Sequence, residues 1–315
     1  MNKCILGIDT SNYRTSVALV DLSGKVLESK RQLLEVKKGE RGLRQSDALF
    51  QHIKNIPGLL KEIMGTQNQI VAVSYSSRPR PVEGSYMPVF LAGQTVAESI
   101  AASLKVPCYE FSHQEGHIAA AKSCTEITDE PFISFHFSGG TTECLLCKDG
   151  SIEKVGGTLD ISFGQIVDRI GVKLGYNFPC GEELDQLLLT ENAEPNIEIT
   201  KVKIKKSCFN LSGLETQLLK LIEDGNNPKY VVFIAFSEIA RIMNELVTSL
   251  GNQYKINDFI FAGGVSSSKF IRNMITSKHN LYFAPEELSG DNAVGVALLG
   301  GLKYGQETGN NITTE

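Results

Sequence analysis

Two stretches of the chain repeat the same order of apolar and polar runs. The pattern of residues 3–33 is that of three strands separated by a small polar bend and a Ser-Gly turn, which predicts an antiparallel meander. Residues 132–158 repeat strand, glycine-rich bend, strand, Asp-Gly turn and strand. After the first meander we expect a helix at about 46–63, a strand at 70–77, a helix at 91–104 and a strand at 106–111. After the second we expect a helix at 163–175, a strand at 258–264 and a helix from about Ser266.

A repeated meander followed by alternating helices and strands predicts a duplicated α/β fold with a central cleft between its halves. The predicted halves are residues 1–110 and 111–315, and the second is expected to carry a helical insertion at about 160–225. At 315 residues the chain is long enough for two domains of ordinary size.

Charge and hydropathy narrow the function classes. A formal net charge of −5 argues against a generic nucleic-acid-binding surface, so any RNA contact would need a local patch. The basic cluster KVKIKK at 201–206 is more typical of a solvated edge strand. No apolar run approaches the roughly 18 residues of a membrane span, and the seven irregularly spaced cysteines favour reduced thiols. We therefore expect a cytoplasmic protein that is not bound to a membrane.

Three small-residue loops carry candidate binding chemistry. They contribute Asp9, Thr10 and Ser11 from IDTS, His136, Phe137, Ser138, Gly139 and Gly140 from HFSGG, and Gly263, Gly264 and Ser268 from GGVSSS. Glycine lets the backbone approach an anion closely, and successive N–H groups can bind phosphate. The GGVSSS loop opens a helix, and nucleotide binding is slightly favoured there over a plain strand-to-helix turn. The first two loops, each taken alone, are more often merely structural. Their place in both halves is similar to the actin-like ATPase superfamily, whose halves are ribonuclease H-like, and this favours nucleotide binding.

FSHQEGH predicts a helix that carries two histidines on one face. Ser112 and Glu115 form a capping box, so the helix should begin at His113. His113 and His117 then lie one turn apart and can share a metal ion, and the helix dipole should keep their rings neutral. A zincin protease needs its glutamate directly after the first histidine. Glu115 comes two residues after His113, about 200° round the helix, which excludes that interpretation.

Two histidines alone make an incomplete site, so a hydrogen-bonded pair at a domain junction stays equally open. Asp291, expected to cap a small-residue helix, could supply a third ligand. His136 alternates with apolar residues and could line the cleft. Asp168, on the predicted helix at 163–175, would ordinarily form a surface ion pair with Arg169 or Lys173.

The motifs GIDTS, HQEGH, SGGTT, GGTLDISFGQIVDRIGVKLGYNFPCG, FNLSGLET, FAGGVSSS and SGDNAVGVALLG occur in this order over nearly the whole chain. Together they resemble the catalytic-subunit family of tRNA threonylcarbamoyladenosine synthase, formerly called O-sialoglycoprotein endopeptidase. The resemblance implies that one divalent metal, iron or zinc, is held by His113, His117 and Asp291. It also implies that threonylcarbamoyl-AMP is bound by residues 136–140 with Asp168, Gly181 and Ser268.

The implied reaction transfers the threonylcarbamoyl group to N6 of the adenosine next to the anticodon and releases AMP. The implied partners are tRNA and the other proteins of a synthase complex. No protein nucleophile is needed, and the sequence singles out no catalytic side chain.

Several positions depart from the family pattern and indicate a divergent paralogue. These are Tyr13 and Arg14 in place of an acidic pair, Arg78 and Arg80 in an altered loop, Thr141 in SGGTT, Glu215 in SGLET and Ser268 in place of asparagine. Two alternatives to the transferase stay open: a non-catalytic partner subunit, and a superfamily ATPase or carbamoyltransferase with another acceptor.

Overall fold

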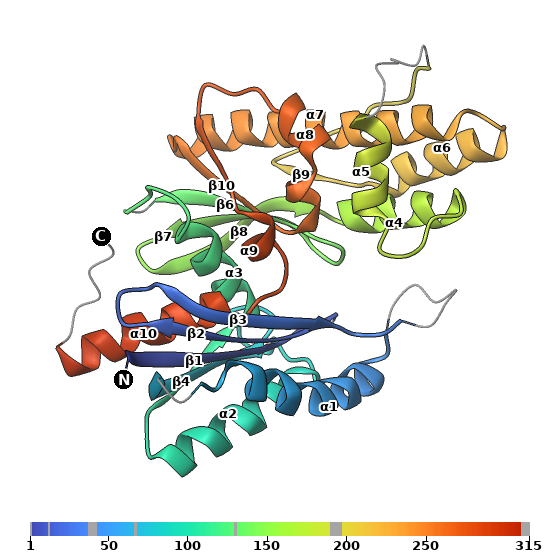
Figure 1. Cartoon of the computed structure of the whole chain (residues 1–315). Coiled ribbons are helices and arrows are strands. Elements are labelled where there is room, and N and C mark those ends of the chain that lie inside the picture. The colour runs from blue at the N-terminus through green and yellow to red at the C-terminus, as the bar shows by residue number, and fades with distance from the viewer. Residues whose placement is uncertain are drawn as a thin grey trace. The chain divides into compact units, whose positions relative to one another are not determined.

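The structure, a computed structural model, describes residues 2–11, 13–36, 43–65, 68–128, 131–189 and 197–309. The chain forms two units, each with its own mixed sheet and helices (Figure 1). Unit 1 comprises Met1–Cys124 and Asp291–Glu315, and unit 2 comprises Thr125–Gly290.

The sheet of unit 1 has the strand order β3-β2-β1-β4-β5. Its strands are β1 (Asn2–Thr10), β2 (Arg14–Asp21), β3 (Val26–Leu33), β4 (Asn68–Arg78) and β5 (Cys108–Ser112). The first three form the predicted antiparallel meander, and β4 and β5 continue the sheet in parallel. Because side chains alternate along each strand, the two faces of this sheet carry different sets of residues.

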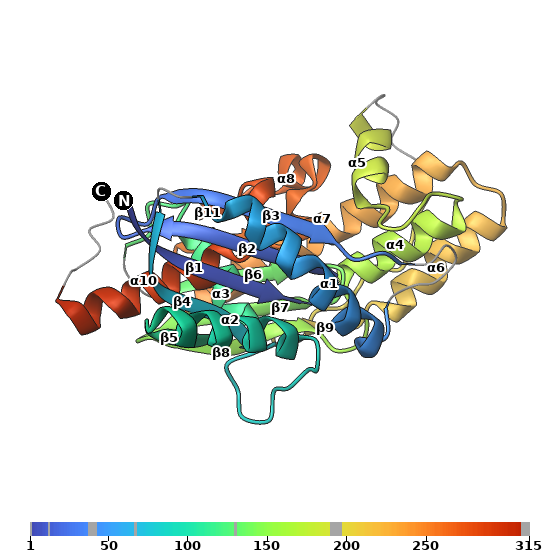
Figure 2. The same cartoon turned by 60° about the horizontal axis from the view of Figure 1, so that its bottom comes forward.

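Helices among the described residues cover both faces of the unit 1 sheet. The helices α1 (Gln45–Ile63) and α2 (Phe90–Leu104) cover one face, where apolar side chains of β1, β2 and β4 form the core (Figure 2). The helices α3 (His113–Lys122) and α10 (Val294–Thr308) lie on the opposite side (Figure 1). These bounds match the helices predicted at 46–63 and 91–104.

The end of the chain returns to unit 1, which corrects the predicted boundary near residue 110. The helices α3 and α10 pack so closely that a Cβ atom at Gly295 would overlap the backbone of Gly116. Glycine at both positions lets the two helices meet. The helices α3 and α10, which were predicted to belong to the second half, 111–315, therefore belong to unit 1. No local sequence pattern could reveal that these two helices pack together.

The sheet of unit 2 has the order β11-β10-β6-β7-β8-β9. Its strands are β6 (Phe132–Phe137), β7 (Thr142–Lys148), β8 (Ser151–Thr158), β9 (Cys208–Phe209), β10 (Asp258–Ala262) and β11 (Asn280–Phe283). The β6-β7-β8 meander is antiparallel, and β10 and β11 extend it in parallel as β4 and β5 do in unit 1. The repeated topology confirms the duplication.

The helices of unit 2 enclose an aromatic and aliphatic core. They are α4 (Phe163–Lys173), α5 (Gly181–Leu189), α6 (Ser212–Glu223), α7 (Pro228–Tyr254), the 3₁₀ helix η1 (Gly264–Ser267), α8 (Lys269–Met274) and α9 (Glu286–Ser289). The helix expected from Ser266 begins only at Lys269, because η1 comes first and Ser268 caps α8. The basic run at 201–206 is not the edge strand that was expected, since only Lys205 makes a bridge, to Cys208.

Candidate functional site

The capping box predicted for FSHQEGH is present. Ser112 Oγ accepts a hydrogen bond from the Glu115 amide at 3.1 Å. In return, Glu115 Oε2 accepts a hydrogen bond from the Ser112 amide at 2.6 Å. The helix α3 therefore begins at His113, directly after β5. This places His113 and His117 on successive turns of one face, as the spacing predicted.

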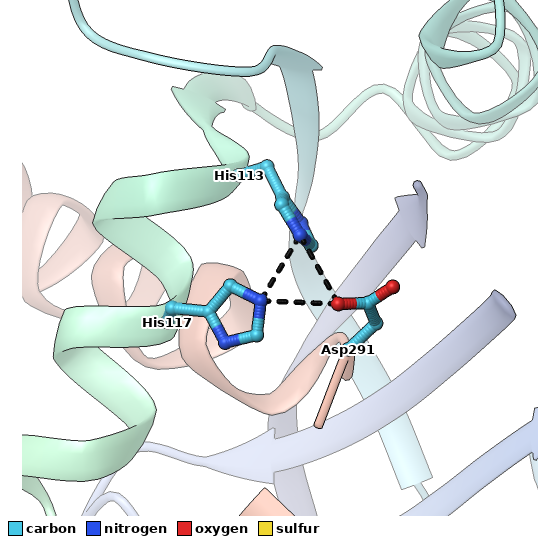
Figure 3. Close-up of side chains that lie close together, drawn as sticks. All are labelled: His113, His117 and Asp291. Carbon is cyan, nitrogen blue, oxygen red and sulfur yellow. Dashed lines mark hydrogen bonds and ion pairs between the residues drawn. The ribbon is translucent and has the colours of Figure 1, made fainter. Parts of the chain in front are cut away.

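Three side chains of unit 1 converge on one point (Figure 3). The Nε2 atoms of His113 and His117 are 3.0 Å apart, and they lie 3.3 Å and 3.2 Å from Asp291 Oδ1. Atoms bound at about 2.1 Å by one ion are about 3.0 Å apart when the bonds are perpendicular and about 3.4 Å apart in a tetrahedron. The triangle therefore fits one face of a metal coordination sphere. Two imidazoles and a carboxylate are a donor set for iron or zinc.

Asp9 holds the first histidine from behind. Its Oδ1 atom lies 2.8 Å from His113 Nδ1, which leaves Nε2 directed at the other two candidate ligands. The carboxylate is 1% exposed, and its Oδ2 makes no hydrogen bond to any described residue. A carboxylate behind a ligating imidazole fixes its tautomer and orientation. Asp9 was predicted to bind nucleotide, whereas its observed contact is with this histidine.

Ser11 contacts the carboxylate of the third candidate ligand, Asp291, and His52 contacts Ser11. Ser11 Oγ donates to Asp291 Oδ2 at 2.5 Å, so Oδ1 is left for the histidines. The Ser11 carbonyl accepts from His52 Nε2 at 2.8 Å, and His52 Nδ1 accepts from Thr15 Oγ1 at 2.8 Å. Burial lowers the pKa of His52, which keeps this ring neutral. Sequence spacing singled out neither this role of Ser11 nor His52.

Asp291 does not cap the helix that follows it, which corrects that expectation. Asn292 Oδ1 instead accepts from the amides of Val294 and Gly295 at 3.0 and 3.4 Å. The Asp291 carboxylate is therefore free for the histidines. A Cβ atom at Gly7 would clash with the backbone of Ala293, so glycine in β1 allows this segment to approach the strand. Thr10, in contrast, contacts the α2 side, donating to the Val89 carbonyl at 3.0 Å.

The electrostatics of the cluster favour a cation. Burial lowers the pKa of His113, but the carboxylates of Asp9 and Asp291 outweigh it and raise this pKa to about 10. Burial raises the pKa of Asp291, but its hydrogen bonds with His113 and His117 bring it well below the usual value. The expectation that the helix dipole keeps His113 neutral is thus wrong for the metal-free protein. A metal ion would take the place of the proton between these groups.

The second glycine-rich bend, in unit 2, has open space beside it. Ser138 N–H donates to the Thr141 carbonyl at 2.8 Å, and Thr141 N–H donates to Ser138 Oγ at 3.1 Å, closing the bend. Gly139 and Gly140 are exposed, and a Cβ atom added at either would meet no described atom within 4 Å. Neither lies in the left-handed region. The fold of the chain therefore does not require glycine at these two positions, whereas close approach of a ligand would.

Two further segments pack against this bend. Ser162 Oγ, at the start of α4, donates to the Gly139 carbonyl at 2.7 Å, and Gly164 is so close that a Cβ atom would lie 2.5 Å from Gly139 Cα. Gly263 has φ +94° and would clash with the Phe137 backbone if it carried a side chain. The HFSGG and GGVSSS loops thus lie in contact within unit 2. The contribution of Ser162 and Gly164 was missed, although LDISFGQ carries a capping-box signal.

Of the remaining predicted residues of unit 2, Asp168 and Ser268 make contacts at helix ends, whereas His136 lies in the sheet. Asp168 is not in a surface ion pair: its Oδ1 accepts from the Cys180 amide at 2.9 Å, directly before Gly181, and burial raises its pKa. Ser268 Oγ donates to Asp185, whose carboxylate also accepts from the first amides of α8. His136 is buried on β6 and pairs across the strands with Glu143.

The comparisons with known proteins assign the chain to a family. Its residues 27–298 match the TsaD family, described as tRNA N6-adenosine threonylcarbamoyltransferase. The chain belongs to this family. Enzymes of that name are acyltransferases, and the match confirms the resemblance that the sequence motifs indicated.

Named relatives of the TsaD family align along nearly the whole chain. It is 28% identical to the tRNA N6-adenosine threonylcarbamoyltransferase of Wolbachia pipientis wMel over 95% of this chain and 92% of the relative. It is 30% identical to the enzyme of that name from Neorickettsia sennetsu, over 94% of this chain and 92% of the relative. A probable bifunctional tRNA threonylcarbamoyladenosine biosynthesis protein of Methanothermobacter thermautotrophicus is 30% identical, over 95% of this chain and 55% of that longer protein.

Solved structures confirm the actin-like ATPase fold. HypF of T. kodakarensis superposes with a TM-score of 0.62 at 15% identity, over 97% of this chain, which spans about half (48%) of that protein. The activator of 2-hydroxyisocaproyl-CoA dehydratase from Clostridium difficile superposes with a TM-score of 0.56 at 12% identity, over 97% of both chains.

The departures from the family pattern have separate structural settings. Glu215 accepts two hydrogen bonds of 3.0 Å from Arg169, which joins α6 to α4. Arg78 ends β4, and its guanidinium lies 3.7 Å from the Glu110 carboxylate, while Arg80 is exposed in the loop before α2. Thr141 closes the SGG bend through its backbone.

Proposed function

We propose that this TsaD-family protein is a metal-dependent tRNA N6-adenosine threonylcarbamoyltransferase. The observation that carries the proposal is the triangle of His113, His117 and Asp291 atoms, held from outside by Asp9 and Ser11. A scaffold protein has no need of three converging ligand side chains with oriented partners. The metal would be iron or zinc, which are the ions suited to this donor set.

The proposed reaction is an acyl transfer without a protein nucleophile. The N6 amine of adenosine attacks the carbamoyl carbonyl of threonylcarbamoyl-AMP, the bond from this carbon to the phosphate oxygen breaks, and AMP leaves as N6 gives up one proton. A bound divalent ion would supply Lewis-acid polarisation of the carbonyl or charge neutralisation at the phosphate. The protein's part is to hold the reacting groups in place.

The chain's own residues divide this work. Asp9 fixes the ring of His113, and Ser11 leaves one oxygen of Asp291 available to the ion. In unit 2 we assign adenylate binding to the exposed Gly139 and Gly140. Further residues of unit 2 assigned to that task are His136, Phe137, Ser138, Asp168, Gly181, Gly263, Gly264 and Ser268. The ADPNP bound in the related dehydratase activator supports a nucleotide ligand for this fold.

The partners and location follow from the reaction. The substrates would be tRNA and threonylcarbamoyl-AMP, with other proteins of a threonylcarbamoyladenosine synthase as partners and the cytoplasm as the compartment. Among the described residues, no helix has both the length and the apolar character needed to span a bilayer.

The test is to give the metal-loaded protein threonylcarbamoyl-AMP and unmodified tRNA, then measure N6-threonylcarbamoyladenosine in the digested tRNA. We expect product from the wild type, and loss of both metal and product from His117→Ala. His279→Ala is the matched control, because this histidine bonds Asn257 in unit 2, outside the triangle. Metal-loaded wild type that forms no product, alone or with other family proteins, would contradict the proposal and favour a non-catalytic subunit.

A further inference from the structure

Arg14, near the start of β2, lies on the same sheet face as the candidate metal site. Two residues further along β2, Ser16 pairs with Asp9 across the hairpin, and Asp9 contacts His113. Because alternate residues of a strand share a face, Arg14 lies on the face of Asp9. The intervening Thr15 points the other way, where its hydroxyl bonds His52 of α1.

The guanidinium of Arg14 has no hydrogen-bond or ion-pair partner among the described residues. The nearby acid, Asp291, has both oxygens engaged already: Oδ1 faces the two histidines and Oδ2 accepts from Ser11. Arg31 of β3 lies opposite Ser16 in the sheet register, so it shares this face. Its positive charge repels that of Arg14. Arg14 is therefore a positive group near Asp291 that no carboxylate oxygen of Asp291 remains free to bind.

Arg14 is also partly withdrawn from water. Burial lowers the pKa of its guanidinium, although the negative charge of Asp291 raises it in part. A half-buried positive charge without an ion-pair partner costs free energy unless an anion compensates it. The planar guanidinium matches carboxylate and phosphate groups with two parallel hydrogen bonds.

We propose that Arg14 binds an oxyanion of the acyl donor next to the metal and so selects donors that carry one. This inference rests on the proposed function, whose donor offers two such groups: the carboxylate of the threonyl moiety and the phosphate of the adenylate. Arg14 is a specificity-determining residue in this scheme, and the ligands of the metal remain His113, His117 and Asp291.

The test measures ligand affinity of the metal-loaded full chain by calorimetry, without requiring turnover. The probes are N-carbamoyl-L-threonine, its neutral amide, and AMP. The variants are Arg14→Gln, Arg14→Lys and the matched control Arg31→Gln, whose arginine is exposed one strand further out on the same face. Metal affinity and the melting temperature are measured in parallel.

We expect Arg14→Gln to weaken binding of one anionic probe by about tenfold to a hundredfold, the size of a lost charge-assisted hydrogen bond. Binding of the neutral amide should change less than about twofold, and Arg14→Lys should restore part of the loss. A loss confined to N-carbamoylthreonine assigns the carboxylate, and a loss confined to AMP assigns the phosphate. Metal affinity should hold or increase, because a positive charge near Asp291 is removed.

Three results would overturn the inference: equal binding of both anionic probes by wild type and Arg14→Gln, no binding of either by the wild type, or equal losses in Arg14→Gln and Arg31→Gln. A selective Arg14 effect in a protein that modifies no tRNA would sink the proposed transferase activity while leaving the oxyanion site in place.

Discussion

Asp9 and His113 lie 104 residues apart in the chain, yet Asp9 Oδ1 is 2.8 Å from His113 Nδ1. This contact joins the first hairpin of unit 1 to the first turn of α3. It gives the IDTS segment a contact with a proposed metal ligand, besides any contact with nucleotide. The candidate site of unit 1 therefore consists of two layers, the three ligand side chains and the residues that orient them.

Replacing Asp9 tests the outer layer. Asp9→Asn keeps the shape of the side chain but removes its charge, so we expect metal affinity to fall by about tenfold to a hundredfold while the fold is retained. Affinity is measured by competition with a chelator of known strength. Asp47→Asn is the control, since Asp47 is exposed in the first turn of α1. Unchanged affinity in Asp9→Asn would show that the contact does not support the ligand.

Metal binding should depend on pH through His113. Its pKa in the metal-free protein is raised to about 10, so the ring holds a proton at neutral pH that the metal must displace. We expect metal affinity to rise by about tenfold per pH unit between pH 6 and 8, with about one proton released per ion. Calorimetry in buffers of different ionisation enthalpy counts this proton.

The same shift affects stability without metal. Because the folded pKa of His113 lies above the ordinary 6.5, its contribution to folding is complete below pH 6.5 and is lost as the pH rises through about 10. Asp9→Asn removes one cause of the raised pKa and should flatten both trends. A pH-independent metal affinity in the wild type would contradict this assignment.

The contact between α3 and α10 should be sensitive to a single methyl group. Gly295→Ala would place Cβ against the backbone of Gly116, and we expect a loss of about 1–3 kcal/mol, seen as a lower melting temperature by circular dichroism. Gly213→Ala in α6 is the control, because its Cβ would meet no described atom within 4 Å. That substitution should be neutral or stabilising by up to about 1 kcal/mol. Equal melting temperatures for the two variants would refute the close packing.

Asp160 should contribute to the acid stability of unit 2. Its carboxylate accepts the Leu211 and Ser212 amides at 2.8 and 3.0 Å, which ties the end of β8 to the start of α6. Partial burial raises the pKa of Asp160, but these hydrogen bonds bring it down to about 2. Since the folded pKa is depressed, the stabilisation is present above the ordinary value of about 3.9 and is lost as the pH falls towards 2.

The measurement is the melting temperature of wild type and Asp160→Asn from pH 7 to pH 2. We expect the variant to be less stable at pH 7 and the difference to shrink below pH 4. Asp149→Asn is the control, because Asp149 is exposed in the turn between β7 and β8, at the other end of β8. A difference that stays constant down to pH 2 would mean that the charge of Asp160 is not what stabilises this junction.

Local sequence patterns identified most elements and the two histidines of the candidate site. The meanders, the capping box of α3 and the one-turn spacing of His113 and His117 were confirmed, because each depends on residues close together in the chain. The errors concern distant partners. Asp291 was expected to cap a helix, but Asn292 accepts the hydrogen bond from the helix amide instead. Asp168 was expected to form a surface ion pair, but it accepts a hydrogen bond from the Cys180 amide.

The sequence by itself determined the duplicated meander topology, the start of α3 and the face that bears its two histidines, since periodicity and capping act over a few residues. Only the tertiary structure decided that the end of the chain returns to unit 1. That return brings Asp291 to the histidines and Asp9 and Ser11 behind the ligands. Such contacts depend on close backbone approaches at Gly7 and between Gly116 and Gly295. A glycine in the sequence shows that close packing is possible, but it does not show which segment will pack there.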